Sequence, residues 1–245
     1  MPESVASDNS VSAAPETFRK RLLRHGAGAL TDGELLALLL GHDSCDQPSL
    51  ELSTRILDDL GGLRGIGTRS ECLRRMPGLA EAHCATLTAI HEIACRFARA
   101  SVESCVLLDE PGLVARYVYV RHAASDQEVF GVLFLDIANR LIGEELIFRG
   151  TLSRIAVEPR PILRSALEHG AAGLLLFHTH TTTNSSPSAC DLQFTGRVRK
   201  AADTLGIRLV DHVIVAQNGH WSSLHRRATV PVRDDGRHES EERAS

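Results

Sequence analysis

The sequence lacks the features that mark membrane-spanning, secreted or strongly charged proteins. Its longest strongly apolar stretches, such as 35–40, are a handful of residues, whereas a membrane-spanning helix needs about 20. No basic segment followed by an apolar one opens the chain, so we expect a cytoplasmic protein without a membrane partner. A net charge of −4 and a pI of about 6.3 exclude a global electrostatic field that would attract nucleic acid or membrane.

Cysteine patterns with metal-ligand spacing are also missing. The six cysteines include no Cys-x-x-Cys pair, which disfavours a zinc ribbon and favours reduced thiols over disulfides. The His-x-Glu and Pro-Cys-x-x-Cys patterns of zinc deaminases are absent, so we set that enzyme class aside. What remains is a chain of 245 residues, 43% hydrophobic, that can bury one or two sizeable cores.

The most informative pattern is His178-Thr179-His180 followed by Ser188 and Asp191. Two histidines and a carboxylate are the ligands of a hydrolytic zinc site that keeps one coordination position open for water. The pair alone carries little weight, because 12 histidines in 245 residues place about 0.6 His-x-His pairs by chance. Requiring Ser and Asp at these spacings lowers the chance rate roughly two hundredfold, so the whole constellation predicts a zinc site.

The flanking residues predict where the ligands lie. The apolar run 173–177 indicates a buried strand that His178 and His180 close, both on one face with Cα atoms about 6–7 Å apart. Ser188 fits the N-cap of a following helix, and Asp191 falls three residues later. A capping box without any metal is the alternative interpretation of this Ser/Asp pair, and the two histidines favour the metal.

A zinc site for hydrolysis needs a general base. Glu128 begins the apolar run 129–135, which indicates a strand, and it is our first candidate, although an acidic residue at a strand edge is often only solvated. Three other glutamates are rival candidates: Glu144, Glu145 and Glu158.

These residues carry a resemblance to a known family. Glu128-Val-Phe-Gly-Val-Leu followed by His-x-His-x7-Ser-x2-Asp is similar to the JAMM/MPN metallopeptidase signature. The chain also resembles the RadC family, often described as DNA repair proteins, over roughly residues 18–225. The stretches that carry this second likeness are Arg149-Gly-Thr-Leu, Asp211-His-Val-Ile-Val, Arg19-Lys-Arg-Leu-Leu-Arg-His-Gly and Leu30-Thr-Asp-Gly-Glu-Leu-Leu-Ala-Leu-Leu-Leu-Gly.

The resemblance implies a set of roles. His178, His180 and Asp191 would bind Zn²⁺, and Glu128 would take a proton from water. Ser188 would stabilise an oxyanion on a protein or peptide substrate. Three further residues would support the ligands from behind: Thr151, Asp211 and His212. The loop 181–186 departs from the family pattern, because it keeps the length but lacks the Pro and Gly that set the turn.

The N-terminal half raises the question of nucleic acid. Thr31 to Glu34 is a capping box that opens an apolar helix, and Gly61-Gly62 ends the helix that follows. Residues 76–80 resemble the turn of a helix-hairpin-helix, and Gly78 with Arg74 and Arg75 are the candidate DNA contacts. From 16 to 100 we count 11 Lys/Arg and 11 Asp/Glu, so the module is about neutral, and DNA contact is implied mostly by the family resemblance.

The predicted architecture is α/β: a small all-α domain precedes a three-layer α/β domain that resembles the JAMM, or cytidine-deaminase-like, fold. We expect a disordered tail over 1–15, a helical domain over 16–100, a linker over 101–112, the metal domain over 113–225 and a disordered tail over 226–245. Two functions remain. The first is a RadC-like zinc-dependent peptidase or isopeptidase, and the alternative is a non-catalytic repair accessory or scaffold protein whose metal is structural.

Overall fold

The chain divides into two compact units. The computed structural model describes residues 16–42, 47–107, 110–122, 125–150, 158–225 and 228–231. The first unit is Met1–Thr88 and the second is Ala89–Ser245. The division falls inside the long helix α6, Glu81–Glu103, whereas the sequence placed a domain boundary at residue 100. Each unit is described by itself below.

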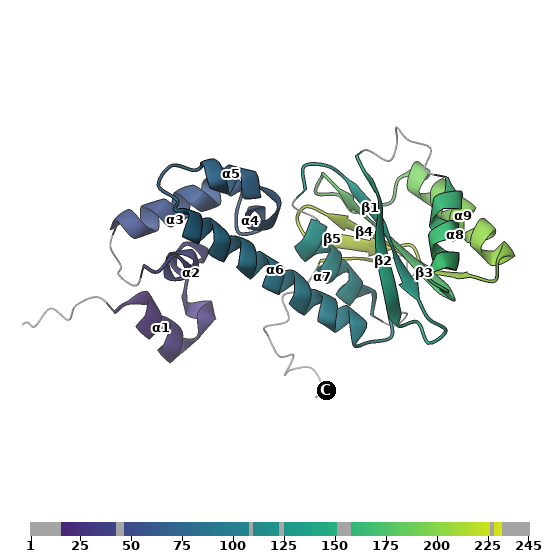
Figure 1. Cartoon of the computed structure of the whole chain (residues 1–245), viewed down its shortest axis with the longest axis horizontal. Helices are drawn as coiled ribbons and strands as arrows, with labels where there is room; N and C mark the ends of the chain where they lie inside the picture. Colours follow the sequence, from purple (N-terminus) through teal and green to yellow (C-terminus); the bar gives the residue numbers. More distant parts are fainter. Residues whose placement is uncertain are drawn as a thin grey trace, which may run out of the picture. The chain divides into compact units, whose positions relative to one another are not determined.

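The first unit is built of helices, as the all-α prediction requires (Figure 1). They pack around fully buried apolar side chains that include Leu36, Ile56, Leu73 and Leu87. The helices are α1 Phe18–His25, a 3₁₀ turn η1 Ala27–Ala29, α2 Asp32–Leu39, α3 Gln47–Leu60, α4 Gly65–Thr68, α5 Ser70–Arg75 and the start of α6.

The helix start at Thr31 and the glycines that follow α3 lie where the sequence predicts them. Thr31 Oγ1 accepts the Glu34 N–H at 3.3 Å, and Glu34 Oε2 accepts the Thr31 N–H at 2.8 Å, so α2 begins with a complete capping box. Helix α3 ends at Gly61 and Gly62, whose φ angles of 70° and 96° only glycine adopts readily. Residues 76–80, named here the hairpin turn, connect α5 to α6, with Gly78 at φ 86°.

The second unit is organised on a six-stranded sheet with the order β2-β1-β3-β4-β5-β6 (Figure 1). Strands β3 and β4 run parallel, and the other neighbouring pairs run antiparallel. The strands are β1 Val129–Leu135, β2 Leu141–Arg149, β3 Gly173–His180, β4 Arg208–Ala216, β5 His220–Ser223 and β6 Ala228–Pro231. Strand β1 is buried along its whole length, as its continuous apolar run predicts.

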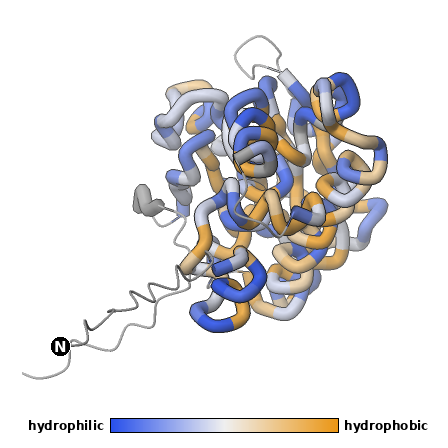
Figure 2. The backbone as a smooth tube through the Cα atoms, turned by 90° about the vertical axis from the view of Figure 1, so that its left-hand side faces the viewer, coloured by the Kyte–Doolittle hydropathy of each residue, from blue (hydrophilic) through white to orange (hydrophobic). Residues whose placement is uncertain are grey.

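Helices cover both faces of this sheet, which gives the predicted three layers. Helices α8, Pro159–Glu168, and α9, Ala189–Thr204, cover what we call the α9 face, with a core that includes Phe130, Leu176 and Phe194. Helix α7, Pro111–His122, and the last turns of α6 cover the α7 face. In Figure 2 the helical turns alternate between hydrophilic and hydrophobic segments, as expected of helices with one buried side. The predicted α/β class is therefore confirmed.

The structure corrects two boundaries. Residues 101–103, predicted to be part of the linker, are the last turn of α6, and 111–112 already belong to α7. Residues 228–231, predicted within a disordered tail, form β6, whose backbone pairs Val230 with Trp221. The charged composition after residue 232 hid this short strand-forming segment from the sequence argument. The remainder of both predicted tails lies outside the described residues. None of the helices that the structure describes has both the length and the apolar character to cross a membrane.

Candidate metal centre

Strand β3 carries the two histidines to the edge of the α9 face. In its antiparallel register with β1, His178 lies opposite Phe130, a core residue of that face. Thr179, between the histidines, points the other way and accepts the Val129 N–H on its Oγ1 at 2.9 Å. This bond fixes the start of β1 beside the end of β3. Alternation along β1 then places Glu128 on the same face as Phe130, and the β1–β3 register continued by two residues sets Glu128 opposite His180.

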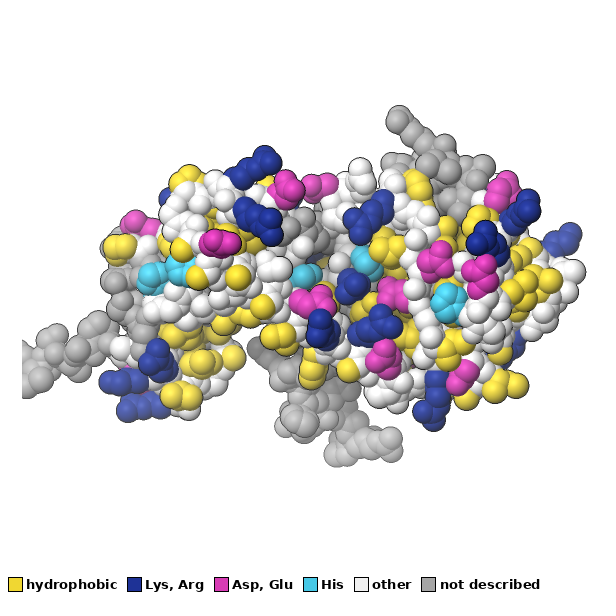
Figure 3. Space-filling model, in the orientation of Figure 1, with side chains coloured by type: hydrophobic (Ala, Val, Ile, Leu, Met, Phe, Trp, Pro, Cys, Tyr) yellow, Lys and Arg dark blue, Asp and Glu magenta, His cyan; other side chains and the backbone are white. Residues whose placement is uncertain are grey.

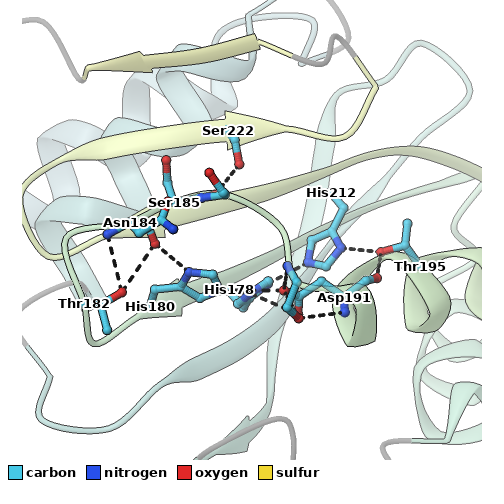
Figure 4. A network of polar contacts seen from close by, with 11 residues as sticks. His178, His180, Thr182, Asn184, Ser185, Asp191, Thr195, His212 and Ser222 are labelled. Atoms are coloured by element: carbon cyan, nitrogen blue, oxygen red, sulfur yellow. Dashed lines mark hydrogen bonds and ion pairs between the residues drawn. The ribbon is translucent and has the colours of Figure 1, made fainter.

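The three predicted ligands converge. His178 Nε2 lies 2.9 Å from His180 Nε2, 3.4 Å separate His178 Nε2 from Asp191 Oδ1, and 3.7 Å separate His180 Nε2 from Asp191 Oδ2 (Figure 4). His178 and Asp191 are 0% and 5% exposed, so solvent water screens the interaction between these two side chains little. Among the described residues this is a group that could hold a metal ion.

Asp191 is both a helix cap and a candidate ligand. Ser188 Oγ and Ser188 N both donate to Asp191 Oδ2 at 2.7 Å, and the Asp191 N–H donates to Ser188 Oγ at 3.2 Å, which completes the capping box of α9. With Oδ2 engaged in this way, Oδ1 faces His178. The sequence offered cap and ligand as alternatives, and in the structure the capping carboxylate also lies next to both histidines. The Ser188 hydroxyl proton is directed to Asp191, so in this structure Ser188 orients the carboxylate.

The histidine rings present the atoms that a metal requires. His180 Nδ1 lies 2.8 Å from the Asn184 main-chain oxygen, which only accepts, so Nδ1 carries the proton and the Nε2 of the neutral ring is free. Two imidazole nitrogens 2.9 Å apart need a proton or a cation between them, because two lone pairs repel and two N–H groups collide. The donor set and the ring orientation therefore fit a divalent cation with nitrogen preference, such as Zn²⁺.

Electrostatics favour metal binding at His178 and Asp191, whereas a proton competes with the metal at His180. Burial lowers the pKa of His178 well below its ordinary value of 6.5, with a contribution from the neighbouring His212. Burial would raise the pKa of Asp191, but His180, His178 and Ser188 outweigh it and hold that pKa far below the ordinary range. Burial would lower the pKa of His180, but Asp191 and the Asn184 carbonyl raise it. A neutral His178 beside an ionised carboxylate is the state that a metal needs.

The rival bases lie elsewhere. Glu144 is on the α7 face, where its Oε2 accepts from Tyr117 at 2.5 Å and from Arg99 at 3.2 Å. Glu158 is the N-cap residue of α8 and its side chain makes no cap bond. Glu145 lies opposite Val132, in the middle of β1. Glu128, by contrast, lies opposite His180 in the continued β1–β3 register, and after Asp191 and Asn184 its charge also contributes to the raised pKa of His180.

The supporting residues named from the sequence separate in space. His212 contacts His178 directly, with 2.8 Å between His212 Nε2 and His178 Nδ1, and burial lowers the pKa of His212 to about 4. Asp211 instead accepts from Ser223 Oγ at 2.6 Å and from the His225 N–H at 2.9 Å, so it holds the end of β5. Thr151 lies outside the described residues.

Two contributors were missed by the sequence argument. Thr195 lies on α9 four residues after Asp191, and its Oγ1 is 2.6 Å from His212 Nδ1. The i, i+4 spacing from Asp191 is a signal that could have placed Thr195 on the same helix face. Asn184 acts through its main-chain carbonyl, which leaves no trace in a side-chain pattern.

Comparison with known proteins assigns both halves of the chain. Residues 108–229 match the family model described as the RadC-like JAB domain, and residues 13–85 match the model described as UPF0758 N-terminal. A UPF0758 protein of Carboxydothermus hydrogenoformans is 38% identical over 210 residues, which cover 85% of this chain and 93% of that protein. A UPF0758 protein of Pseudomonas entomophila is 40% identical over 213 residues, with the same two shares covered.

Proposed function

The chain belongs to the RadC-like, UPF0758 family, and from that membership and the geometry above we propose that it is a zinc-dependent hydrolase of peptide or isopeptide bonds. One observation carries the proposal. The Nε2 atoms of His178 and His180 and the Asp191 carboxylate face one point at the edge of the α9 face. Three protein ligands leave a fourth position open, which distinguishes catalytic zinc sites from closed structural ones.

Each residue has a role that its position supports. Zinc held there would polarise a carbonyl oxygen and lower the pKa of a water molecule to about 7. Glu128, which follows the β1–β3 register to the position opposite His180, would accept the proton that such a water gives up. Ser188 keeps Asp191 oriented, and it would have to turn its hydroxyl away from Asp191 Oδ2 to donate to an oxyanion.

The first test is metal content. We expect about one zinc per chain by elemental analysis after purification with added Zn²⁺, and a loss of bound zinc in His178→Ala and Asp191→Ala. His169→Ala is the matched control, because His169 bonds to the Ser165 main-chain oxygen of its own helix and contacts no candidate ligand. Equal zinc in all four proteins would refute the ligand assignment.

The second test is hydrolysis. The zinc-loaded chain and Glu128→Gln are incubated with a mixed peptide library, and new termini are identified by mass spectrometry. We expect Glu128→Gln to retain zinc and to lose at least about 100-fold in cleavage rate, because a general base contributes 10²–10⁴-fold. Zinc binding without cleavage by the unaltered chain would instead favour a non-catalytic accessory protein with a structural metal.

A further inference from the structure

Behind His178 lies a buried chain of hydrogen bonds that a three-ligand zinc site does not itself require. His212 of β4 and Thr195 of α9 are 1% and 3% exposed and lie on the α9 face (Figure 4). His178 Nδ1 is 2.8 Å from His212 Nε2, and His212 Nδ1 is 2.6 Å from Thr195 Oγ1. Thr195 Oγ1 is also 2.6 Å from the main-chain oxygen of Asp191.

The main-chain oxygen of Asp191 determines which group donates in each of these hydrogen bonds. The Asp191 carbonyl oxygen can only accept, so the Thr195 hydroxyl donates to it. Thr195 Oγ1 must then accept from His212, which places the His212 proton on Nδ1. A neutral imidazole has one N–H, so His212 Nε2 is an acceptor and receives the Nδ1–H of His178.

This series of hydrogen bonds determines the tautomer of His178. With its proton on Nδ1, His178 presents an unprotonated Nε2 to His180 and Asp191. The opposite tautomer would aim an N–H at the free Nε2 of His180, and the two rings would then satisfy each other where the metal should lie.

We propose that His212 and Thr195 are positioning residues that lock His178 in the Nδ1–H tautomer, so that the Nε2 of His178 carries no proton before the metal arrives. The series of hydrogen bonds starts at the main-chain oxygen of Asp191 and ends at the ring of His178, and both residues are candidate ligands. It therefore also ties α9, which carries Asp191, to β4 and β3. This inference rests on the proposed metal site and adds to it a device that sets metal affinity.

The test uses the full chain and Zn²⁺ alone, with the affinity measured by competition against a chelator. Thr195→Val keeps the shape of the side chain but removes the hydroxyl, and we expect zinc affinity to fall by about 10–100-fold. Thr195→Ser restores the hydroxyl and should restore the affinity. Thr204→Val is the matched control, because Thr204 is exposed at the end of the same helix and donates to the main-chain oxygen of Lys200 at 2.9 Å.

Substitution of His212 gives an independent pair. His212→Gln places an amide oxygen near the position of Nε2 and keeps an acceptor for His178, so it should retain more affinity than His212→Leu. Thermal unfolding of every variant shows whether it is folded. A purely structural role would lower stability in proportion to the loss of affinity.

Long-range ¹H–¹⁵N NMR on the metal-free chain reads the tautomer directly. In the unaltered protein we expect His178 to carry its proton on Nδ1 with Nε2 unprotonated, and in Thr195→Val we expect a mixture of tautomers. If the unaltered chain binds zinc but Thr195→Val has the same affinity and the same His178 tautomer, the proposed positioning role of Thr195 is wrong and the proposed metal site is unaffected. If the unaltered chain binds no zinc, the proposed function fails, and a protonated His178 Nε2 in the same spectrum would overturn the lock as well.

Discussion

At the scale of single residues, the contact between Gly131 and Phe177 shows how the strand that carries the histidines is seated. A Cβ atom at position 131 would lie 2.3 Å from Phe177 Cζ, a distance that real atoms do not reach. Phe177 immediately precedes His178, is fully buried and stacks on His122 with ring centroids 5.7 Å apart. The absence of a side chain on β1 is therefore what lets this ring lie flat across it.

We expect Gly131→Ala to lower the free energy of unfolding by about 1–3 kcal/mol, because a fully buried ring must leave its position to admit one methyl group. Denaturant unfolding with linear extrapolation measures the change. Gly196→Ala is the control with the opposite sign. Gly196 is exposed within α9 with nothing within 4 Å of an added Cβ, so alanine should stabilise the helix by about 0.5–1 kcal/mol. The same change in stability for both variants would contradict this account of Phe177.

At the scale of elements, Glu144 joins two helices to the edge strand β2. Its Oε2 accepts from Tyr117 of α7 at 2.5 Å and from Arg99 of α6 at 3.2 Å, and His122 Nε2 lies 3.8 Å from its Oε1. Burial would raise the pKa of Glu144, but His122 and the Tyr117 hydroxyl outweigh it and lower that pKa below the usual 4.5. The ionised carboxylate is thus bound more strongly in the folded chain than in the unfolded one.

We expect Glu144→Gln to lower the free energy of unfolding by about 1–3 kcal/mol near neutral pH, since hydrogen bonds to a buried charge are lost. A folded-state pKa below the unfolded value gives stability that is present above about pH 4.5 and disappears as the pH falls through the folded-state pKa. The difference in the free energy of unfolding between Glu144→Gln and the unaltered chain should therefore become smaller in acid. Unfolding curves at several pH values measure this difference.

Glu168→Gln provides the comparison for this effect. Glu168 pairs with Arg164 at 2.8 Å, but the two side chains are 58% and 78% exposed, so we expect a change under about 0.5 kcal/mol. If both glutamine variants had the same small effect, Glu144 would be no more than a solvated surface charge.

At the scale of the whole molecule, charge decides how much the N-terminal unit can contribute to DNA binding. Arg74 and Arg75 are exposed in the last turn of α5, just before the hairpin turn, but Arg75 pairs with Glu71 at 3.4 Å. Figure 3 shows Lys and Arg side chains interspersed with Asp and Glu across the visible face. Such a surface releases few counterions, and any affinity for duplex DNA depends on a small number of phosphate contacts.

We therefore expect weak, sequence-independent binding of duplex DNA, with a Kd of about 10⁻⁶–10⁻⁴ M at physiological salt. Fluorescence anisotropy at several salt concentrations should show the double variant Arg74→Ala/Arg75→Ala binding more weakly, with a salt slope smaller by about 2. Arg199→Ala/Lys200→Ala removes two exposed charges from α9 and serves as the control. An equal loss of DNA affinity in both double variants would show that the arginines before the hairpin turn are not a specific DNA contact.

The sequence by itself determined the elements and the chemistry of the candidate site. Capping boxes at Thr31 and Ser188, the buried runs of β1 and β3 and the glycine end of α3 are local signals, since a few neighbouring residues settle each of them. The spacing of His178, His180 and Asp191 across a strand end and a helix start is local as well. The grouping of these three side chains, which could hold a metal ion, could therefore be predicted before the fold.

Only the tertiary structure decided which distant side chains share a face. Glu128 and Glu144 were both candidate bases in the sequence, and strand register puts Glu128 on the face of His178 and Glu144 on the opposite face, where it binds Tyr117. Asp211 and His212 are neighbours, yet one holds β5 and the other supports His178. Pairing between strands far apart in the chain sets the register, and a shift of one residue exchanges the two faces, so no local pattern contains this information.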